Sequence, residues 1–237
     1  LTRLTDSGLS MTDWRPILGI IPPLSPENWI LVFEMYKQTP EYKIVNKNMT
    51  LDEFKYIFWW EWFHRIFARA IGIVFIIPLI YFIIRKQIKS SLLARLGIVF
   101  IFGLFQAFIG WWMVKSGLTE NPYVSPYRLT FHLLNALIIF SILLWISMDY
   151  RYSSKISFFS KPQTTEFYVF IAVILIFITI ATGGFMAGTN SGQSFNTFPL
   201  MNGKIIPDDY LIEDLGIYNI FENTVAINFN HRWLSIF

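Results

Sequence analysis

Glu61-Trp62-Phe63-His64-Arg65 stands at the start of a long apolar run, and a similar stretch, Asn228-Phe229-Asn230-His231-Arg232, precedes another apolar turn near the carboxy-terminal end. The chain contains only three histidines, and two of them have this His-Arg context. The third, His132, lies four residues after Arg128 and also just inside an apolar run. Histidines that recur at one place relative to apolar segments indicate a common kind of site.

The composition is that of a membrane protein. Hydrophobic residues make up 54% of the 237 residues and charged residues only 15%, whereas charged residues are roughly a quarter of an ordinary globular domain. There is no cysteine, which excludes disulfides, thiolate metal ligands and cysteine nucleophiles. The net charge of +3 is small, and no basic run resembles a nucleic-acid-binding surface, so no nucleic-acid partner is expected.

Four segments are apolar for long enough to cross a bilayer, which takes roughly 20 residues. They cover residues 63–84, 96–114, 129–148 and 167–186, and a fifth begins near Phe229. Thr50-Leu51-Asp52-Glu53 is a capping box that predicts the start of the helix leading into the first span, and Trp59, Trp60 and Trp62 indicate the lipid–water boundary. The fold class is therefore an all-α polytopic transmembrane helical bundle.

A shorter helix is expected outside the membrane, before the first span. Ser25 and Pro26 predict its start, and Pro40 predicts its end near Gln38. Its apolar residues recur at helical spacing, which suits either a helix that lies on the membrane surface or simple packing against the bundle; they are Trp29, Ile30, Phe33 and Tyr36.

The orientation follows from the basic residues between spans, which favour the cytoplasmic side. The connection after the first span and the one after the third are rich in them, with Arg85, Lys86, Lys89 and Arg95 in one and Arg151, Lys155 and Lys161 in the other. The connection between the second and third spans holds only Lys115 and Arg128. The three histidines are therefore expected near the opposite, periplasmic face, at a common depth.

The sequence also contains an internal repeat. Residues 1–10 align with residues 185–194 through a shared Thr-Asp/Asn-Ser-Gly-x-Ser core, and in each copy an outer loop leads on to a His-Arg pair. This order predicts one four-helix unit used twice. Residues 1–150 would form the amino-terminal half without its first helix, and residues 151–237 the start of the second half. The sequence would then be an internal segment of an eight-span protein, covering about spans 2–5 and the start of span 6.

His64, His132 and His231 are candidate haem iron ligands. A single histidine on an apolar helix is usually a hydrogen-bonded packing residue, but three at one depth, two of them in matching repeats, favour a cofactor site. Neutral imidazole is a common axial ligand of haem iron, and helical bundles build cofactor sites from facing helices. A zinc site is less favoured, because no cysteine or further histidine is available. His64 and His132 would hold one haem, and His231 would hold a second with a partner beyond Phe237.

The charged residues beside the histidines have two interpretations each. Arg65, Arg128 and Arg232 either extend toward lipid headgroups or bind haem carboxylates. Glu61 precedes His64 by three residues and so lies on the same side of the helix, where it is either a solvated interfacial acid or a general acid/base. Asn228 occupies that place in the second copy, which suggests that one haem is modified and the other transfers electrons.

With these motifs, the chain closely resembles the haem A synthase family, of the branch shared by mitochondria and alphaproteobacteria. Besides the two His-Arg stretches, the resemblance rests on three segments; they are Thr5-Asp6-Ser7-Gly8-Leu9-Ser10-Met11, Phe33-Glu34-Met35-Tyr36-Lys37-Gln38-Thr39-Pro40-Glu41-Tyr42 and Gly183-Gly184-Phe185-Met186-Ala187-Gly188-Thr189. The ordered set covers nearly the whole chain. Some relatives carry a cysteine pair in the first outer loop, and this chain has none.

The resemblance implies eight spans in two pseudo-symmetric halves and a reaction that oxidises the C8 methyl of haem o to the formyl group of haem a. It implies that His64 and His132 bind the substrate haem, that His231 binds a haem b, and that Glu61 is catalytic. Haem o would come from a farnesyl-transferring haem O synthase, and the electron donor is unknown. The expected location is the bacterial inner membrane, or alternatively the mitochondrial inner membrane, with a possible homo-oligomer.

Two other functions are compatible with parts of the pattern. A bis-histidine two-haem electron-transfer cytochrome would use the same ligands without modifying haem, and the Glu61/Asn228 difference argues against it. A repeat-based transporter would relay protons through histidines. It would also need acids near the middle of the membrane, and the expected spans contain none.

Overall fold

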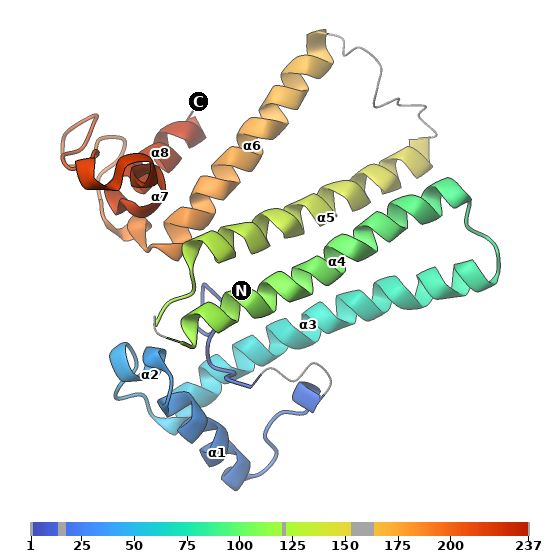
Figure 1. Cartoon of the computed structure of the whole chain (residues 1–237), viewed down its shortest axis with the longest axis horizontal. Helices are drawn as coiled ribbons and strands as arrows, with labels where there is room; N and C mark the ends of the chain where they lie inside the picture. The colour runs from blue at the N-terminus through green and yellow to red at the C-terminus, as the bar shows by residue number, and fades with distance from the viewer. Residues whose placement is uncertain (1, 14–17, 120–121, 153–163, 237) are drawn as a thin grey trace. The chain divides into compact units, whose positions relative to one another are not determined.

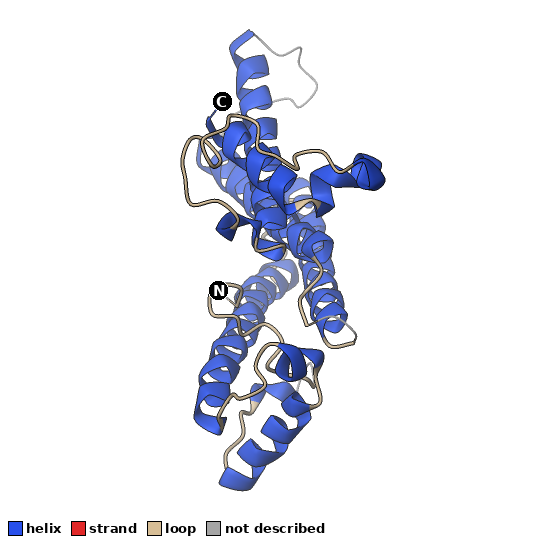
Figure 2. Cartoon of the chain, turned by 90° about the vertical axis from the view of Figure 1, so that its left-hand side faces the viewer, coloured by secondary structure: helices blue, strands red, loops and turns tan. Residues whose placement is uncertain are grey.

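The computed structural model describes residues 2–13, 18–119, 122–152 and 164–236. The regular elements formed by these residues are helices, joined by loops that contain one isolated β-bridge between Met201 and Lys204 (Figure 2). The chain divides into two compact units, Leu1–Val124 and Ser125–Phe237. The expected division into two pseudo-symmetric halves at residue 150 stays a prediction.

Four of the helices are long and apolar enough to cross a membrane: α3 (Leu51–Ile84), α4 (Ser90–Gly117), α5 (Pro126–Tyr152) and α6 (Thr164–Gly188) (Figure 1). Large apolar side chains along them point outward, and Val74, for example, is 73% exposed. Such a surface is stable in lipid and not in water. The all-α multi-pass fold expected from the sequence is therefore confirmed. Lys155 and Lys161, on which the expected orientation partly depends, lie outside the described residues.

α3 carries the first candidate site and begins where the sequence predicts. The Thr50 hydroxyl accepts a hydrogen bond from the Glu53 amide, and the Glu53 carboxylate accepts one from the Thr50 amide, so the capping box is complete. The helix has 34 residues, which corresponds to a length of about 51 Å, whereas the hydrocarbon core of a bilayer is only about 30 Å thick. The amino-terminal turns of α3 therefore extend beyond the hydrocarbon core.

These outer turns of α3 support the core of the first unit. α1 (Pro26–Lys37), which starts at the expected Ser25 cap, and the short α2 (Pro40–Ile44) pack against them (Figure 1). Phe33 and Tyr36 are buried, and the ring centroid of each lies 5.0 Å from that of Phe54. Of the two interpretations of this segment, packing is therefore confirmed for Phe33 and Tyr36, while Ile30 stays 52% exposed.

The second unit is built on α6. α5 packs closely along it because glycines remove side chains at the contact: a Cβ on Gly184 would lie 3.2 Å from the Thr130 Cα, and one on Gly188 would lie 2.7 Å from the Pro126 Cα. α8 (Thr224–Ile236) packs against α6 as well. The connection between α6 and α8 contains η2 (Ser191–Gln193), η3 (Glu213–Tyr218) and α7 (Asn219–Glu222) (Figure 1). His231 is thereby held on α8 beside α6.

Candidate functional site

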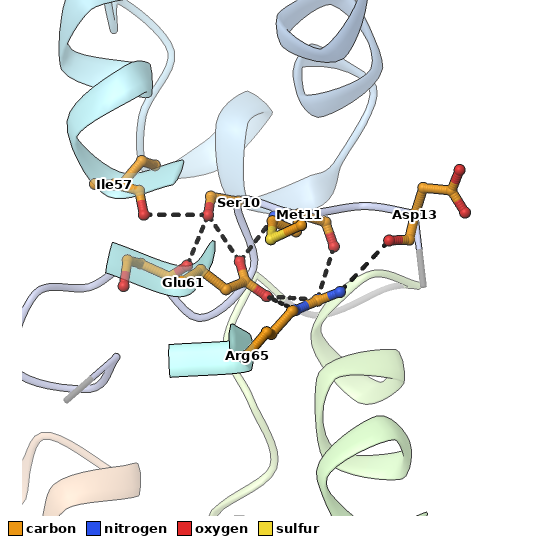
Figure 3. Close-up of polar contacts among 7 residues, drawn as sticks. Ser10, Met11, Asp13, Ile57, Glu61 and Arg65 are labelled. Carbon is orange, nitrogen blue, oxygen red and sulfur yellow. Dashed lines mark hydrogen bonds and ion pairs between the residues drawn. The ribbon is translucent and has the colours of Figure 1, made fainter. Parts of the chain in front are cut away.

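Glu61 is a buried acid that binds the loop carrying the first Thr-Asp-Ser-Gly-x-Ser motif to α3. Its side chain is only 2% exposed. The Ser10 hydroxyl and the Met11 backbone amide each donate a hydrogen bond to Glu61 Oε2 at 2.7 Å (Figure 3). A buried carboxylate is stable only when its oxygens are paired in this way. The loop that carries the first Thr-Asp-Ser-Gly-x-Ser motif is therefore fixed directly to the helix that carries His64.

Arg65 completes this arrangement from one turn further along α3. Its Nε and Nη2 donate to Glu61 Oε1 at 3.1 and 2.6 Å, and its Nη groups also donate to the backbone carbonyls of Met11 and Asp13 at 3.1 and 3.4 Å (Figure 3). A carboxylate has about four acceptor positions, and the four donors fill them. The residue that follows His64 is thus joined to both the acid and the loop. We call Ser10, Met11, Asp13, Glu61 and Arg65 the loop anchor.

The second repeat forms the same contacts between an arginine and a loop. Arg232 Nη2 donates to the Phe195 carbonyl at 2.8 Å, and Arg232 Nη1 donates to the Thr197 carbonyl. When the alignment of the repeats is continued by three residues, Phe195 matches Met11 and Thr197 matches Asp13. The arginine after each His-Arg histidine therefore binds the same two loop carbonyls in both copies.

The loop turns themselves also match. The Ser10 amide donates to the Ser7 carbonyl at 3.2 Å, and the aligned Ser194 amide donates to the Ser191 carbonyl at 3.1 Å. Ser7 and Ser191 are both fully buried. Asn228 takes the place of Glu61 and donates through Nδ2 to the Ser191 carbonyl at 2.6 Å. These shared contacts support the internal repeat that the sequence indicates.

The two copies differ in charge. Glu61 forms an ion pair with Arg65, with Nη2 and Oε1 2.6 Å apart, whereas the matching Asn228 is neutral. Asn228 is fully buried, and its Oδ1 has no hydrogen-bond partner among the residues that the structure describes. Only the first copy therefore combines its histidine with a buried, fully bonded anion.

His231 has one ring nitrogen bound and one available. Its Nδ1 lies 3.0 Å from the Thr182 hydroxyl oxygen on α6, and the Thr179 backbone of the same helix is also within reach of the ring. No side chain of the described residues is hydrogen-bonded to Nε2. This is the state in which an imidazole binds a metal, because ligating histidines usually donate their other N–H to a protein acceptor. His231 therefore fits the expected role of a haem ligand.

The other two histidines lie on separate units. His64 is half-buried on α3 in the first unit, and its ring makes no hydrogen bond to the described residues. His132 is half-buried on α5 in the second unit. Their binding of one haem from opposite faces stays a prediction. The described residues contain no group of three or more His, Cys, Asp or Glu side chains that could hold a metal ion, so within them there is no support for the zinc alternative.

Two of the three arginines beside the histidines contact protein groups, and neither lipid headgroups nor haem carboxylates are needed to explain these contacts. The guanidinium groups of Arg65 and Arg232 donate hydrogen bonds to loop carbonyls, and that of Arg65 also donates to the Glu61 carboxylate. Arg128 lies in the first turn of α5, half-buried. Binding of haem carboxylates by these arginines stays a prediction, and for Arg65 and Arg232 it would have to share groups that already hold the outer loops.

A second buried acid lies close to the loop anchor, in the outer part of the first unit. Glu41 in α2 accepts a hydrogen bond from the Tyr36 hydroxyl at 2.8 Å, and Asn46 donates to that same hydroxyl at 2.8 Å. Burial raises the pKa of Glu41 to about 7; the Tyr36 hydrogen bond lowers it, and the charges of Glu61 and Asp6 raise it further. Glu41 therefore changes its protonation near neutral pH.

Folding stability should fall as the pH rises through this range. The pKa of Glu41 is higher in the folded protein than its ordinary value of 4.5, so its contribution is fully present below about pH 4.5 and is lost as the pH rises through 7, a loss of up to roughly 3 kcal/mol. Glu41→Gln should remove this dependence. The measurement is the thermal midpoint of the purified protein in detergent from about pH 5 to 8, with the exposed Glu34→Gln as the matched control. An unchanged slope in Glu41→Gln would show that Glu41 does not change its protonation between about pH 5 and 8.

Several of these residues carried little or no sequence signal. Ser10 and Met11 belong to the repeated motif, but nothing in the motif indicates that they bind Glu61. Tyr36 was expected only as an apolar residue on a helix face, and Glu41 belongs to a segment that the sequence singled out without giving this acid a role. Thr182 looks like one more small residue in an apolar helix. In hindsight, the spacing of the repeat was the one usable signal, since it brings the motif and the His-Arg pair together twice.

Comparison with known proteins gives a consistent result. A family model described as cytochrome oxidase assembly protein matches residues 1–237. A protein named Heme A synthase from Wolbachia pipientis subsp. Culex pipiens is 45% identical over 99% of this chain and 71% of its own length. Proteins of the same name from Nitrosospira multiformis and Nitrosomonas eutropha are 43% and 44% identical, over 99% and 100% of this chain and 66% and 68% of their own lengths. The chain thus spans about two thirds of the length of these relatives. No solved structure matches it.

Proposed function

Because this chain belongs to the family of cytochrome oxidase assembly proteins, we propose that it is a membrane enzyme of haem a synthesis. The reaction is the oxidation of the C8 methyl of haem o to a formyl group. The similarity to proteins named Heme A synthase supports the pathway, and the histidines with their anchored loops support haem as the molecule that is bound.

The observation that carries this proposal is the duplicated anchor. In each copy a histidine is followed at once by an arginine that binds two carbonyls of the preceding outer loop. A packing histidine has no need of such a support, and two copies of it are hard to explain by chance. Metal ligands do need it, because small errors in the position of an imidazole weaken axial binding.

His64 and His132 would hold the substrate haem, and His231 would hold a haem b together with a ligand elsewhere in the protein. A bound haem supplies the iron chemistry for oxidation in one half and a route for electrons in the other. The chain contributes the imidazoles, their orientation and the closed outer loops above them.

Glu61 is the candidate acid/base residue of the substrate half. Its carboxylate is already bonded to Ser10, Met11 and Arg65, so one of these donors must move away before Glu61 can exchange a proton with a haem substituent. We therefore assign Glu61 primarily a positioning role, in which it holds the loop of Ser10 and Met11 against α3. Its charge, absent from Asn228, distinguishes the half in which haem is modified from the half in which it transfers electrons.

The setting of the enzyme follows from the same proposal. The protein lies in the bacterial inner membrane, or in the mitochondrial inner membrane, with the histidines toward the outer face. A farnesyl-transferring haem O synthase supplies haem o. The step from methyl to formyl removes four electrons and adds one oxygen atom, so it requires an external oxidant of the dioxygen class. A separate electron donor, whose identity the chain does not indicate, is needed to reduce that oxidant. A homo-oligomer is compatible with the outward-facing apolar helices.

The complete protein, expressed with a supply of haem o, should convert this pigment to haem a. The measurement is the mass of the extracted haem, which changes when a methyl becomes a formyl group, together with the visible spectrum of the purified protein. Omitting the haem O synthase is the control and should leave no haem a. If the spectrum shows bis-histidine haem and the pigment keeps its mass, the protein is an electron-transfer cytochrome.

A further inference from the structure

The imidazole of His231 contacts two consecutive residues of α6. The Thr182 hydroxyl oxygen lies 3.0 Å from His231 Nδ1. The next residue, Gly183, faces the edge of the same ring: a Cβ built there would lie 3.1 Å from His231 Cε1, 3.7 Å from Nδ1 and 3.8 Å from Nε2. The ring is therefore in direct contact with the backbone of α6 on one edge and with a hydroxyl at one nitrogen.

The direction of the Thr182 hydrogen bond can be assigned. The Thr182 hydroxyl donates its only proton to the Thr179 carbonyl, 2.8 Å away in the same helix. A hydroxyl has one proton and two lone pairs, so with its proton on the Thr179 carbonyl the Thr182 hydroxyl accepts from His231. We infer from this that His231 carries its proton on Nδ1 and that Nε2 presents a lone pair. This is the tautomer that a metal ion requires at Nε2.

Gly183 and the following Gly184 leave room for side chains of different helices. Gly184 admits Thr130 of α5, whose hydroxyl oxygen would lie 2.7 Å from a Cβ at that position. The three atoms nearest to a Cβ built on Gly183 all belong to the His231 ring of α8. The contact of a separate glycine with the ring edge therefore positions the imidazole, beyond what the packing of α5 on α6 requires.

We propose that Thr182 is a positioning residue for haem ligation, which fixes the tautomer and the angle of the His231 imidazole while Gly183 seats its edge. The inference rests on the proposed function in one respect, that His231 binds haem iron. A hydroxyl that accepts the Nδ1–H makes the imidazole a stronger donor to iron and stabilises the ferric state. Removing it should therefore weaken haem binding and favour the ferrous state.

Thr182→Val in the complete protein tests this directly, because valine keeps the shape of threonine and lacks the hydroxyl. Loss of a hydrogen-bonding partner of a ligating histidine typically weakens metal binding by about 10- to 100-fold, and we expect a loss of haem b at the lower end. If the preference for ferric over ferrous haem falls by about tenfold, the midpoint potential rises by about 59 mV for this one-electron couple. The measurements are haem b content per chain, a redox titration and the electron paramagnetic resonance spectrum of the ferric low-spin haem.

Two further variants separate positioning from general damage. Thr182→Ser keeps the hydroxyl and should restore the potential and the spectrum. Thr179→Val is the matched control. It removes a threonine hydroxyl that bonds only the Leu175 carbonyl, and it leaves in place the Thr179 backbone carbonyl to which Thr182 donates. It should match the wild type in all three measurements.

The outcomes distinguish this inference from the proposed function. If the wild-type protein contains no haem whose signal depends on His231, ligation by His231 is wrong and the proposed function loses its second haem. If that haem is present and Thr182→Val leaves its content, potential and spectrum unchanged, ligation stands and the role of Thr182 is refuted. If Thr182→Ser behaves like Thr182→Val, the hydroxyl is not the group that acts.

Discussion

Replacing Glu61 by glutamine is expected to detach the first outer loop from α3 and to destabilise the folded protein by about 3–5 kcal/mol, the usual cost of breaking a buried ion pair by removing one partner. Haem bound through His64 should be lost with it. The size of the effect follows from burial, because Glu61 is 2% exposed and the Arg65 side chain only 12%, so little water is available to replace the lost charge.

The geometry explains why so small a change should matter. Glutamine has the size of glutamate, but one of its two terminal groups donates hydrogen bonds. In one orientation that group would face the Ser10 hydroxyl and the Met11 amide, and in the other it would face the Arg65 guanidinium. Either orientation brings donors against donors, and both leave the arginine without its anion.

The measurements are the thermal midpoint in detergent, the haem content and the yield of haem a. Glu53→Gln is the matched control: the substitution and the helix are the same, but Glu53 is an exposed capping residue, so the loss should be about 1 kcal/mol. A Glu61→Gln protein that is as stable as the wild type, keeps both haems and makes no haem a would contradict the positioning role. That result would identify Glu61 as a residue of the chemistry itself.

The helices were predictable because their signals are local. Three local signals depend on neighbouring residues only: the capping box at Thr50 and Glu53, the Ser25-Pro26 start of α1, and the long, predominantly apolar runs of α3 to α6. Sequence could not decide how α1 is used, since its apolar face suits lipid and protein equally. That choice depends on Phe54, which supplies the partner surface from a different helix.

The loop anchor was only half predictable. The repeat placed Glu61, Arg65 and Arg232 beside the histidines, and these residues do lie at the centre of the two networks. Their partners were missed because most are backbone carbonyls and amides, such as those of Met11 and Phe195, which every residue carries and no motif records. An arginine beside a histidine suggested that the arginine binds a haem carboxylate. In the structure the guanidinium groups of Arg65 and Arg232 instead bind backbone carbonyls of the loops.

The role of Thr182 could not be predicted from the sequence for a different reason. A threonine in an apolar helix usually bonds its own backbone, and Thr182 does so with Thr179. Its second role depends on His231, which is 49 residues away in the sequence. Only the packing of α8 on α6 brings the two together, and the space for the His231 ring at Gly183 is visible only once both helices are in place.

Replacing His64 by alanine and His132 by alanine should have the same effect, because the proposed function makes them the two ligands of one haem. Each variant is expected to lose one haem per chain and all formation of haem a, and to keep the haem that depends on His231. Loss of an axial ligand exceeds the loss of its hydrogen-bonding partner, so the affinity should fall by more than about 100-fold. Haem content per chain and the low-spin absorbance measure this.

His231→Ala is the comparison that completes the set. It should remove the other haem and leave the haem of the first pair in place, because its network with Thr182 and Arg232 shares no residue with the anchor around Glu61. Adding imidazole to the alanine variants should restore part of the low-spin absorbance if the only loss is the ligand, and should have no effect if the fold has failed. If His64→Ala and His132→Ala lose different haems, the two residues do not share a porphyrin and the substrate site must be assigned to another pair.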